Sequence, residues 1–122
     1  HDDSGHISMA HDGTNVRSVR LRSILEDGPV DLLKLDVEGA EFEILKDCGE
    51  ALRNVSHMIA EVHAMDEHQS NIGELLSQLE TQGFRYVLGD LHQATWVPST
   101  TTPPFRYCRT DRFILTVFAW RA

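Results

Sequence analysis

Four polar side chains stand where two apolar stretches of this sequence end. Asp36 and Glu38 follow one stretch, and Glu61 and His63 close the next. In open α/β sheets, ligands bind outside the carboxyl ends of the strands. Carboxylates are costly to bury there without a partner, and histidine exchanges protons near neutral pH. These residue types at this spacing predict a ligand-binding or proton-transfer site at one edge of a sheet.

Each of these side chains also has a purely structural interpretation. Asp36 can cap the turn that follows it, and Glu38 and Glu41 can be acids at a helix start, where the helix dipole favours anions. His63 can be a structural histidine at a strand end. An acid inside an apolar run needs a partner, so Glu61 can equally form an ion pair with a neighbouring arginine.

The elements that position these residues follow from the spacing of the apolar residues. Continuous apolar runs are typical of parallel strands buried on both faces, and helical spacing predicts a helix between them that stops at Gly49. Lys34, the exception in the first run, is expected to reach toward an edge. The predicted order is a strand at 16–19, a helical turn at 21–26, a strand at 30–37, a helix at 39–48, a strand at 57–63, a helix at 70–82 capped by Ser70 and stopped by Gly83, and strands at 84–88 and 112–120.

This alternation of strands and helices predicts an α/β fold with a mostly parallel sheet in a single domain, residues 1–122. The last two predicted strands are joined by a loop rich in threonine and proline, with no helical pattern. Such a connection favours an antiparallel pair over another parallel crossover.

One string in this sequence resembles a known family. Residues 30–41 read VDLLKLDVEGAE, which is similar to the DLLKxDVEGAE signature of FkbM-type methyltransferases. The preceding VRLRSIL at 19–25 resembles the family's lead-in, FEILK at 42–46 its continuing helix, and IAEVH at 59–63 its next strand. The resemblance covers residues 16–63 closely and the remainder only by architecture.

The resemblance implies methyl transfer from S-adenosylmethionine by the C-terminal half of a Rossmann-like, class I methyltransferase sheet. This chain would supply strands four to seven, with strand seven antiparallel between strands five and six. The family's glycine-rich turn and ribose-binding acid would precede the present sequence, which contains no Gly-x-Gly pattern. We therefore expect a partial domain that binds the cofactor and acts only when joined to its N-terminal half.

The resemblance also suggests roles. Asp36 would lie beside the methyl-donor end of the cofactor or the acceptor, and Glu38 would accept hydrogen bonds at the turn. Methyl transfer to a hydroxyl is an in-line displacement that needs a base for the hydroxyl proton. His63 suits that task, and Glu61 would orient it or the acceptor, expected to be a small-molecule or glycan hydroxyl.

Composition excludes several partners. The net charge is −8, which argues against nucleic acid as the main ligand. No apolar run is long enough for a membrane span, and the first residues do not resemble a signal peptide. Cys48 and Cys108 form no zinc or disulfide signature, so a reduced cytoplasmic protein is expected, although pairing stays open. The C-terminal third has a net charge of +3, and its arginines predict either a basic patch or ordinary solvated side chains: Arg106, Arg109, Arg112 and Arg121.

Two further hypotheses remain. The first is a non-catalytic remnant that forms a homodimer through the edge of the strand at 32–35, because an unpaired apolar edge invites association. The second is a metal-dependent hydrolase, but the spacing matches no closed zinc site and we expect no metal. Its ligands would be Glu61, His63, Asp66, Glu67 and His68, with His1, Asp3, His6 and His11 at the other end of the chain.

Overall fold

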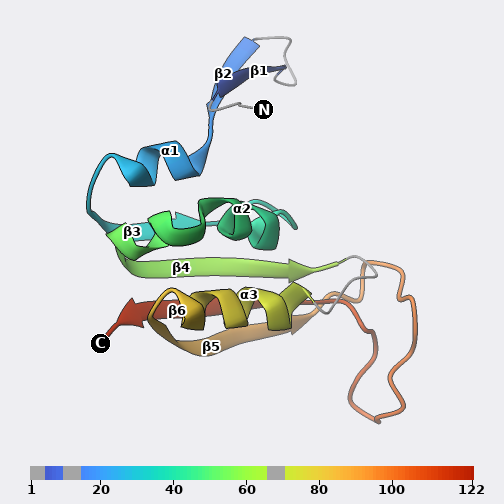
Figure 1. The fold of residues 1–122 in the computed structure, drawn as a ribbon. Helices are drawn as coiled ribbons and strands as arrows, with labels where there is room; N and C mark the ends of the chain where they lie inside the picture. Colours follow the sequence, from blue (N-terminus) through green and yellow to red (C-terminus); the bar gives the residue numbers. More distant parts are fainter. Residues whose placement is uncertain (1–4, 10–14, 66–70) are drawn as a thin grey trace.

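The computed structural model describes residues 5–9, 15–65 and 71–122 of the chain. Figure 1 shows helices lying against one side of a sheet, with a separate hairpin at the N-terminal end. The elements are β1 (Gly5–Met9), β2 (Asn15–Val19), α1 (Leu21–Glu26), β3 (Val30–Leu35), α2 (Glu41–Cys48), the 3₁₀ helix η1 (Gly49–Asn54), β4 (Val55–Ala64), α3 (Asn71–Thr81), β5 (Phe84–Gln93) and β6 (Phe113–Arg121).

The main sheet has four strands in the order β3-β4-β6-β5. β3 and β4 run parallel, so their carboxyl ends reach the same edge of the sheet. β6 lies between β4 and β5 and is antiparallel to both. The prediction of an antiparallel last pair is therefore confirmed, and the fold is α/β with a mixed sheet.

The hydrophobic core lies between one face of this sheet and the helices. Along β4 every second residue from Met58 is buried, as expected for a strand with one covered face. Leu45 of α2 and Leu75 and Leu79 of α3 are completely buried against that face. Burying one leucine side chain stabilises a fold by about 1.5–3 kcal/mol. These helices therefore fix the sheet that carries the polar strand ends.

The prediction that the apolar runs are buried on both faces is wrong for β3. Leu32 is 53% exposed, and Asp31 and Lys34 are also exposed. Among the described strands β3 has only β4 as a neighbour, and α2 and α3 cover one face of the sheet. An edge strand covered on one face leaves half of its apolar side chains in solvent, whatever their hydropathy. Lys34 is exposed as predicted.

Several strand and helix ends also differ from their predicted positions. β4 begins at Val55, which pairs with Val30 of β3, and β5 continues to Gln93 through its pairing with β6. β1 was not predicted and pairs antiparallel with β2. α2 stops at Gly49 as predicted, with a φ of 51° there. Ser70, the predicted cap of α3, lies outside the described residues.

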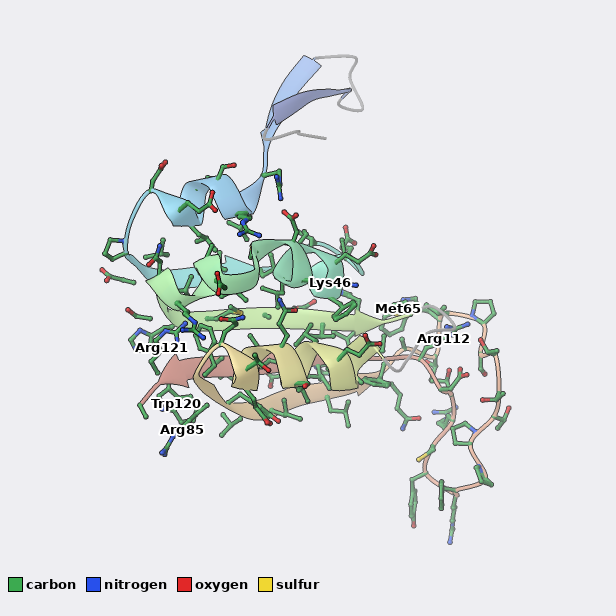
Figure 2. The ribbon with its side chains drawn as sticks, in the orientation of Figure 1. Lys46, Met65, Arg85, Arg112, Trp120 and Arg121 are labelled. Carbon is green, nitrogen blue, oxygen red and sulfur yellow. The ribbon has the colours of Figure 1, made fainter. Side chains whose placement is uncertain are left out.

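The connection from β5 to β6 is a long loop. Its last residues, just before β6, form hydrogen bonds with residues earlier in the loop. Asp111 accepts hydrogen bonds from the amides of Thr100 (3.1 Å) and Thr101 (2.9 Å). Arg112 is buried, and its Nε donates to the Pro98 carbonyl at 3.2 Å. Figure 2 shows Met65, directly after β4, and Arg112, directly before β6, at the same end of the sheet. The loop therefore projects from the edge where β3 and β4 end.

The four C-terminal arginines do not gather into one basic patch. Arg112 holds the loop, and Arg121 donates hydrogen bonds to backbone carbonyls at the other end of the sheet. Arg106 and Arg109 are exposed in the loop. Within the described ranges, no helix is both long and apolar enough to cross a membrane.

Candidate functional site

The polar residues that follow the two parallel strands meet at the carboxyl edge of the sheet. His63, near the end of β4, has its Nε2 atom 3.2 Å from Oε1 of Glu61 and 3.9 Å from Oδ1 of Asp36. Asp36 directly follows β3, so the parallel pairing of β3 with β4 places it there. The His63 side chain is only 10% exposed, whereas those of Asp36 and Glu61 are about half exposed, at 50% and 45%.

A third acid, Glu41, lies beneath this group. It is the first residue of α2 and is 1% exposed. Its Oε2 accepts hydrogen bonds from the amides of Val37 (3.2 Å) and Gly39 (3.0 Å). Its Oε1 accepts one from the amide of His63 at 3.1 Å, and its Oε2 lies 3.1 Å from His63 Nδ1 in hydrogen-bonding geometry. One carboxylate therefore joins the end of β3 to the end of β4.

The turn between β3 and α2 explains how Glu41 reaches this position. Glu38 has a φ of 51° and Gly39 a φ of 109°, so two consecutive residues are left-handed. Gly39 adopts this conformation readily because it has no Cβ, whereas Glu38 stores roughly 1 kcal/mol of strain there. The reversal turns the amides of Val37 and Gly39 toward the first turn of α2. The carboxylate of Glu41 then satisfies both amides.

Glu38 does not accept the hydrogen bonds of this turn, which Glu41 accepts instead. The Glu38 side chain is exposed, and its backbone makes the reversal. The sequence interpretation of Glu41 as merely an acid at a helix start missed its burial. A signal was present, because Glu41 ends the VDLLKLDVEGAE string and lies four residues before Leu45 on the buried side of the helix.

The contacts of Glu61, Asp36 and His63 bear on the structural interpretation of each residue. The ion pair that Glu61 makes within the described residues is with His63, not with an arginine. Within the described residues Asp36 does not cap the turn that follows it, because Glu41 accepts the hydrogen bonds from the amides of Val37 and Gly39. His63 is fixed by Glu41 through one ring nitrogen and faces two half-exposed acids with the other.

The ligand atoms of Asp36, Glu41 and His63 lie within 4.8 Å of one another, close enough to surround a cation. However, the two oxygens of Glu41 already face four nitrogen atoms, three of them backbone N–H donors. A carboxylate offers about four lone-pair directions, so Glu41 is poorly placed to bind a cation as well. Other acids and histidines that the sequence suggested as ligands lie outside the described residues: His1, Asp3, His11, Asp66, Glu67 and His68. His6 lies in β1, where the side chains are outside the described part of the structure.

A cavity of about 480 Å³ opens at the foot of the long loop, beside the same end of the sheet. Its walls come from β5, β6 and the loop and are mostly apolar. Its lining includes Leu91, Pro103 and Phe113 but none of Asp36, Glu61 and His63. The polar cluster and this cavity are therefore separate features of one edge.

Comparison with known proteins agrees with the signature at the strand end. The sequence model of the methyltransferase FkbM domain matches residues 2–86, which include the three acids and the histidine of the cluster. No curated protein and no solved structure matches the chain. Because the family match covers well over half of the residues, the chain belongs to the FkbM methyltransferase family.

Proposed function

We propose that this chain forms the acceptor side of an S-adenosylmethionine-dependent methyltransferase that methylates a hydroxyl of a small molecule or a glycan. Membership of the family supports methyl transfer in general. The observation that carries the finer proposal is the position of His63 Nε2, which faces Asp36 and Glu61 at the carboxyl edge of two parallel strands. This is the edge where open α/β sheets bind their ligands.

The strand order supports a place in a larger Rossmann-like sheet. β3, β4, β6 and β5 correspond to strands four, five, seven and six of the class I arrangement that the sequence resemblance implies. The outer edge of β3 would then pair with the first strand of that sheet. We further propose that a glycine-rich turn and a ribose-binding acid, both part of that arrangement, belong to an N-terminal half that completes the cofactor site.

The donor set at the edge suits only one part of the cofactor. S-adenosylmethionine supplies an electrophilic methyl group on a positively charged sulfonium. Asp36 is a half-exposed carboxylate that would attract this charge, and Glu38 lies two residues further along the same turn. The described residues offer no comparable set of groups for a ribose or an adenine. The described residues therefore fit only the methyl-donor end of S-adenosylmethionine.

The acceptor's chemistry would be organised by the two residues of β4. Nε2 of His63 would take the proton of the acceptor's hydroxyl as that oxygen replaces sulfur on the methyl carbon. The carbon–sulfur bond would break, and the sulfonium would become a neutral thioether. Glu61, 3.2 Å from that nitrogen, orients the acceptor and stabilises the imidazolium that forms. General-base catalysis of this kind contributes about 10²–10⁴-fold to a rate.

The test is transfer of a radiolabelled methyl group from S-adenosylmethionine by the protein encoded by the intact gene to a panel of monosaccharides, oligosaccharides and small alcohols. Label in a hydroxyl product, reduced by Glu61→Gln but not by Glu43→Gln, is the expected result. Glu43 is exposed on α2 and away from the cluster, so it is a matched control. Label found only on nitrogen, or no labelled product although the protein binds S-adenosylmethionine, would overturn the proposal.

A second candidate is self-association through β3. Leu32 is 53% exposed on a strand that has one neighbour among the described strands. Unpaired apolar edges favour pairing with another chain. If a homodimer forms by this edge, light scattering of the 122-residue chain gives twice the monomer mass, and Leu32→Lys restores the monomer. A monomer at all concentrations rules this candidate out.

A further inference from the structure

We propose that Glu41 is a positioning residue that holds His63 in the tautomer with its proton on Nδ1, which leaves Nε2 as the reactive nitrogen. The tautomer is inferred from hydrogen bonding alone. Its consequence for methyl transfer rests on the proposed function. The two statements can therefore be tested separately.

The hydrogen-bond donors around Glu41 require its side chain to be ionised. Three backbone amides, those of Val37, Gly39 and His63, lie at 3.0–3.2 Å from its two oxygens. An amide N–H can only donate, so the carboxyl group must accept all three bonds. A proton on either oxygen would occupy a lone pair that these donors need. The environment therefore selects the carboxylate, whose burial the three hydrogen bonds offset.

The second step assigns the proton on the imidazole. Nδ1 of His63 lies 3.1 Å from Oε2 of Glu41. Since this oxygen belongs to a carboxylate and is an acceptor, Nδ1 must be the donor for a hydrogen bond to exist. A lone pair on Nδ1 would instead face an anion at hydrogen-bonding distance inside a buried site. A carboxylate at one ring nitrogen fixes the tautomer in the same way in histidine–carboxylate pairs of metal and hydrolase sites.

The third step concerns the opposite nitrogen. With the neutral ring protonated at Nδ1, Nε2 carries the lone pair. It lies 3.2 Å from Glu61 and 3.9 Å from Asp36, and their half-exposed side chains line the approach from solvent. Within the described residues Nε2 makes no hydrogen bond, so its lone pair is available to an acceptor's hydroxyl. The opposite tautomer would place a proton there and remove the base.

Glu41 acts through His63 and not on the acceptor, because it is 1% exposed. It also sets the distance between the two strand ends. Its bonds to the amides of Val37 and Gly39 hold the segment after Asp36, and its bond to the amide of His63 holds β4. One buried carboxylate thus fixes both the protonated atom of the base and the position of the acid beside it.

The direct test is nitrogen-15 NMR of the histidine side chains in the 122-residue chain, at a pH above the titration of His63. Long-range proton–nitrogen correlations separate a protonated ring nitrogen from an unprotonated one, and His63→Gln assigns the signals. The expected spectrum has a protonated Nδ1 and an unprotonated Nε2. A protonated Nε2 in the unmodified chain would overturn the proposal without any need for a variant.

The variant Glu41→Gln tests the cause. A glutamine amide can donate to Nδ1, so we expect the population of the Nδ1–H tautomer to fall from dominant to minor. In the complete enzyme we expect kcat to fall by about 10²-fold, within the range for loss of a general base, with an unchanged KM for S-adenosylmethionine. Glu43→Gln, the exposed neighbour on α2, should change neither quantity. An unchanged tautomer in folded Glu41→Gln would contradict the role of Glu41.

These outcomes separate the two proposals. If the protein transfers no methyl group but shows the Nδ1–H tautomer in the unmodified chain and its loss in Glu41→Gln, the transferase proposal fails and the Glu41 inference stands. If methyl transfer occurs but His63 carries its proton on Nε2, the inference fails and the transferase proposal survives. The midpoint of folding, measured by circular dichroism, shows whether Glu41→Gln is folded at the temperature of the spectra.

Discussion

Oδ1 of Asp36 lies 3.9 Å from Nε2 of His63, although Asp36 follows β3, His63 lies near the end of β4, and α2 and η1 separate them in the chain. This contact depends on the parallel pairing of β3 with β4, from Val30 opposite Val55 to Leu35 opposite Ala60. A shift of this register by one residue would turn His63 to the other face of the sheet. The contact between Asp36 and His63 is therefore a consequence of the strand register.

The first prediction concerns the base. In the complete enzyme, His63→Ala should lower kcat by about 10²-fold or more, because it removes the imidazole that faces Asp36 and Glu61. Its effect on the dissociation constant for S-adenosylmethionine should be less than about threefold, since the ring faces the acceptor side. Steady-state kinetics and calorimetry measure the two quantities. Turnover equal to that of the unmodified enzyme would remove His63 from the mechanism.

The second prediction concerns the cofactor. The 122-residue chain contains no Gly-x-Gly pattern, and its acids at the edge suit only the methyl-donor end of S-adenosylmethionine. We expect isothermal titration calorimetry of the purified chain to detect no binding at micromolar concentrations. A dissociation constant in the micromolar range would show that these residues hold the cofactor without a further half-domain.

Much of this architecture follows from the sequence, for physical reasons. The apolar runs before Asp36 and through His63 can be buried only as strands, and the helical spacing between them requires a crossover that makes the strands parallel. Their polar ends must then meet. The lack of a helical pattern between the last two strands likewise predicted that β6 runs antiparallel to β5. These features depend on periodicity, which a single sequence displays.

What the sequence did not predict depends on burial. Glu41 looks like an ordinary helix-start acid until the left-handed turn at Glu38 and Gly39 directs two amides toward it and His63 of β4 supplies a third. Leu32 looks like a core residue until β3 proves to be an edge strand covered on one face. Such properties belong to the environment of a residue and not to its type. Hydropathy therefore predicted the wrong burial for both Glu41 and Leu32.

The third prediction distinguishes the two cysteines, which are both free thiols in the structure. Burial, with a smaller contribution from Asp47, raises the pKa of Cys48 to about 11. Because the thiolate is the reactive form, Cys48 should be almost inert toward a disulfide reagent at pH 8, whereas the exposed Cys108 should react rapidly. The reagent should therefore label one thiol per native chain. Cys108→Ser should abolish the fast phase and Cys48→Ser should preserve it, and two equally fast thiols would contradict the buried position of Cys48.

The fourth prediction is a pH dependence. The guanidinium of Arg20 donates to the carboxylate of Asp47, with Nε 3.0 Å from Oδ2, and this hydrogen bond lowers the pKa of Asp47 below its ordinary value of 3.8. A lowered pKa in the folded state contributes stability above the unfolded pKa, and this contribution is lost as the pH falls through the folded pKa. The pair is exposed, so its contribution is small.

Carbon-detected NMR titration of the Asp47 carboxyl measures this effect directly. The midpoint should lie below 3.8 in the unmodified chain and rise in Arg20→Gln. Arg53→Gln is a suitable control, because Arg53 donates to Gln82 instead of an acid. A midpoint in Arg20→Gln that equals that of the unmodified chain would show that the ion pair does not persist in solution.

The fifth prediction concerns the end of the sheet opposite the site, where Arg121 closes β6. Its Nε donates to the carbonyl of Val55 at 2.8 Å and its Nη2 to that of Leu52 at 2.6 Å. Its guanidinium also lies 4.1 Å from the centre of the Phe84 ring. The guanidinium of Arg121 thus joins η1, β4 and β5. No other charged group takes part in these contacts.

Replacement of Arg121 by methionine keeps much of the apolar stem but removes the guanidinium donor from these carbonyls. The carbonyl of Leu52 keeps its hydrogen bond from the amide of Val55. We expect the free energy of unfolding to fall by about 2–4 kcal/mol, because hydrogen bonds to charged groups each contribute about 1.5–3 kcal/mol and are not additive. Lysine should recover only part of this loss, since an ammonium group cannot span carbonyls that a planar guanidinium reaches together. Arg85, exposed on β5 beside Trp120 in Figure 2, provides the control, and Arg85→Met should change stability by less than about 0.5 kcal/mol. Urea unfolding measures the stability of all three variants. Equal stability of Arg121→Met and Arg85→Met would show that the backbone hydrogen bonds of β6 with β4 and β5 hold this strand without help from Arg121.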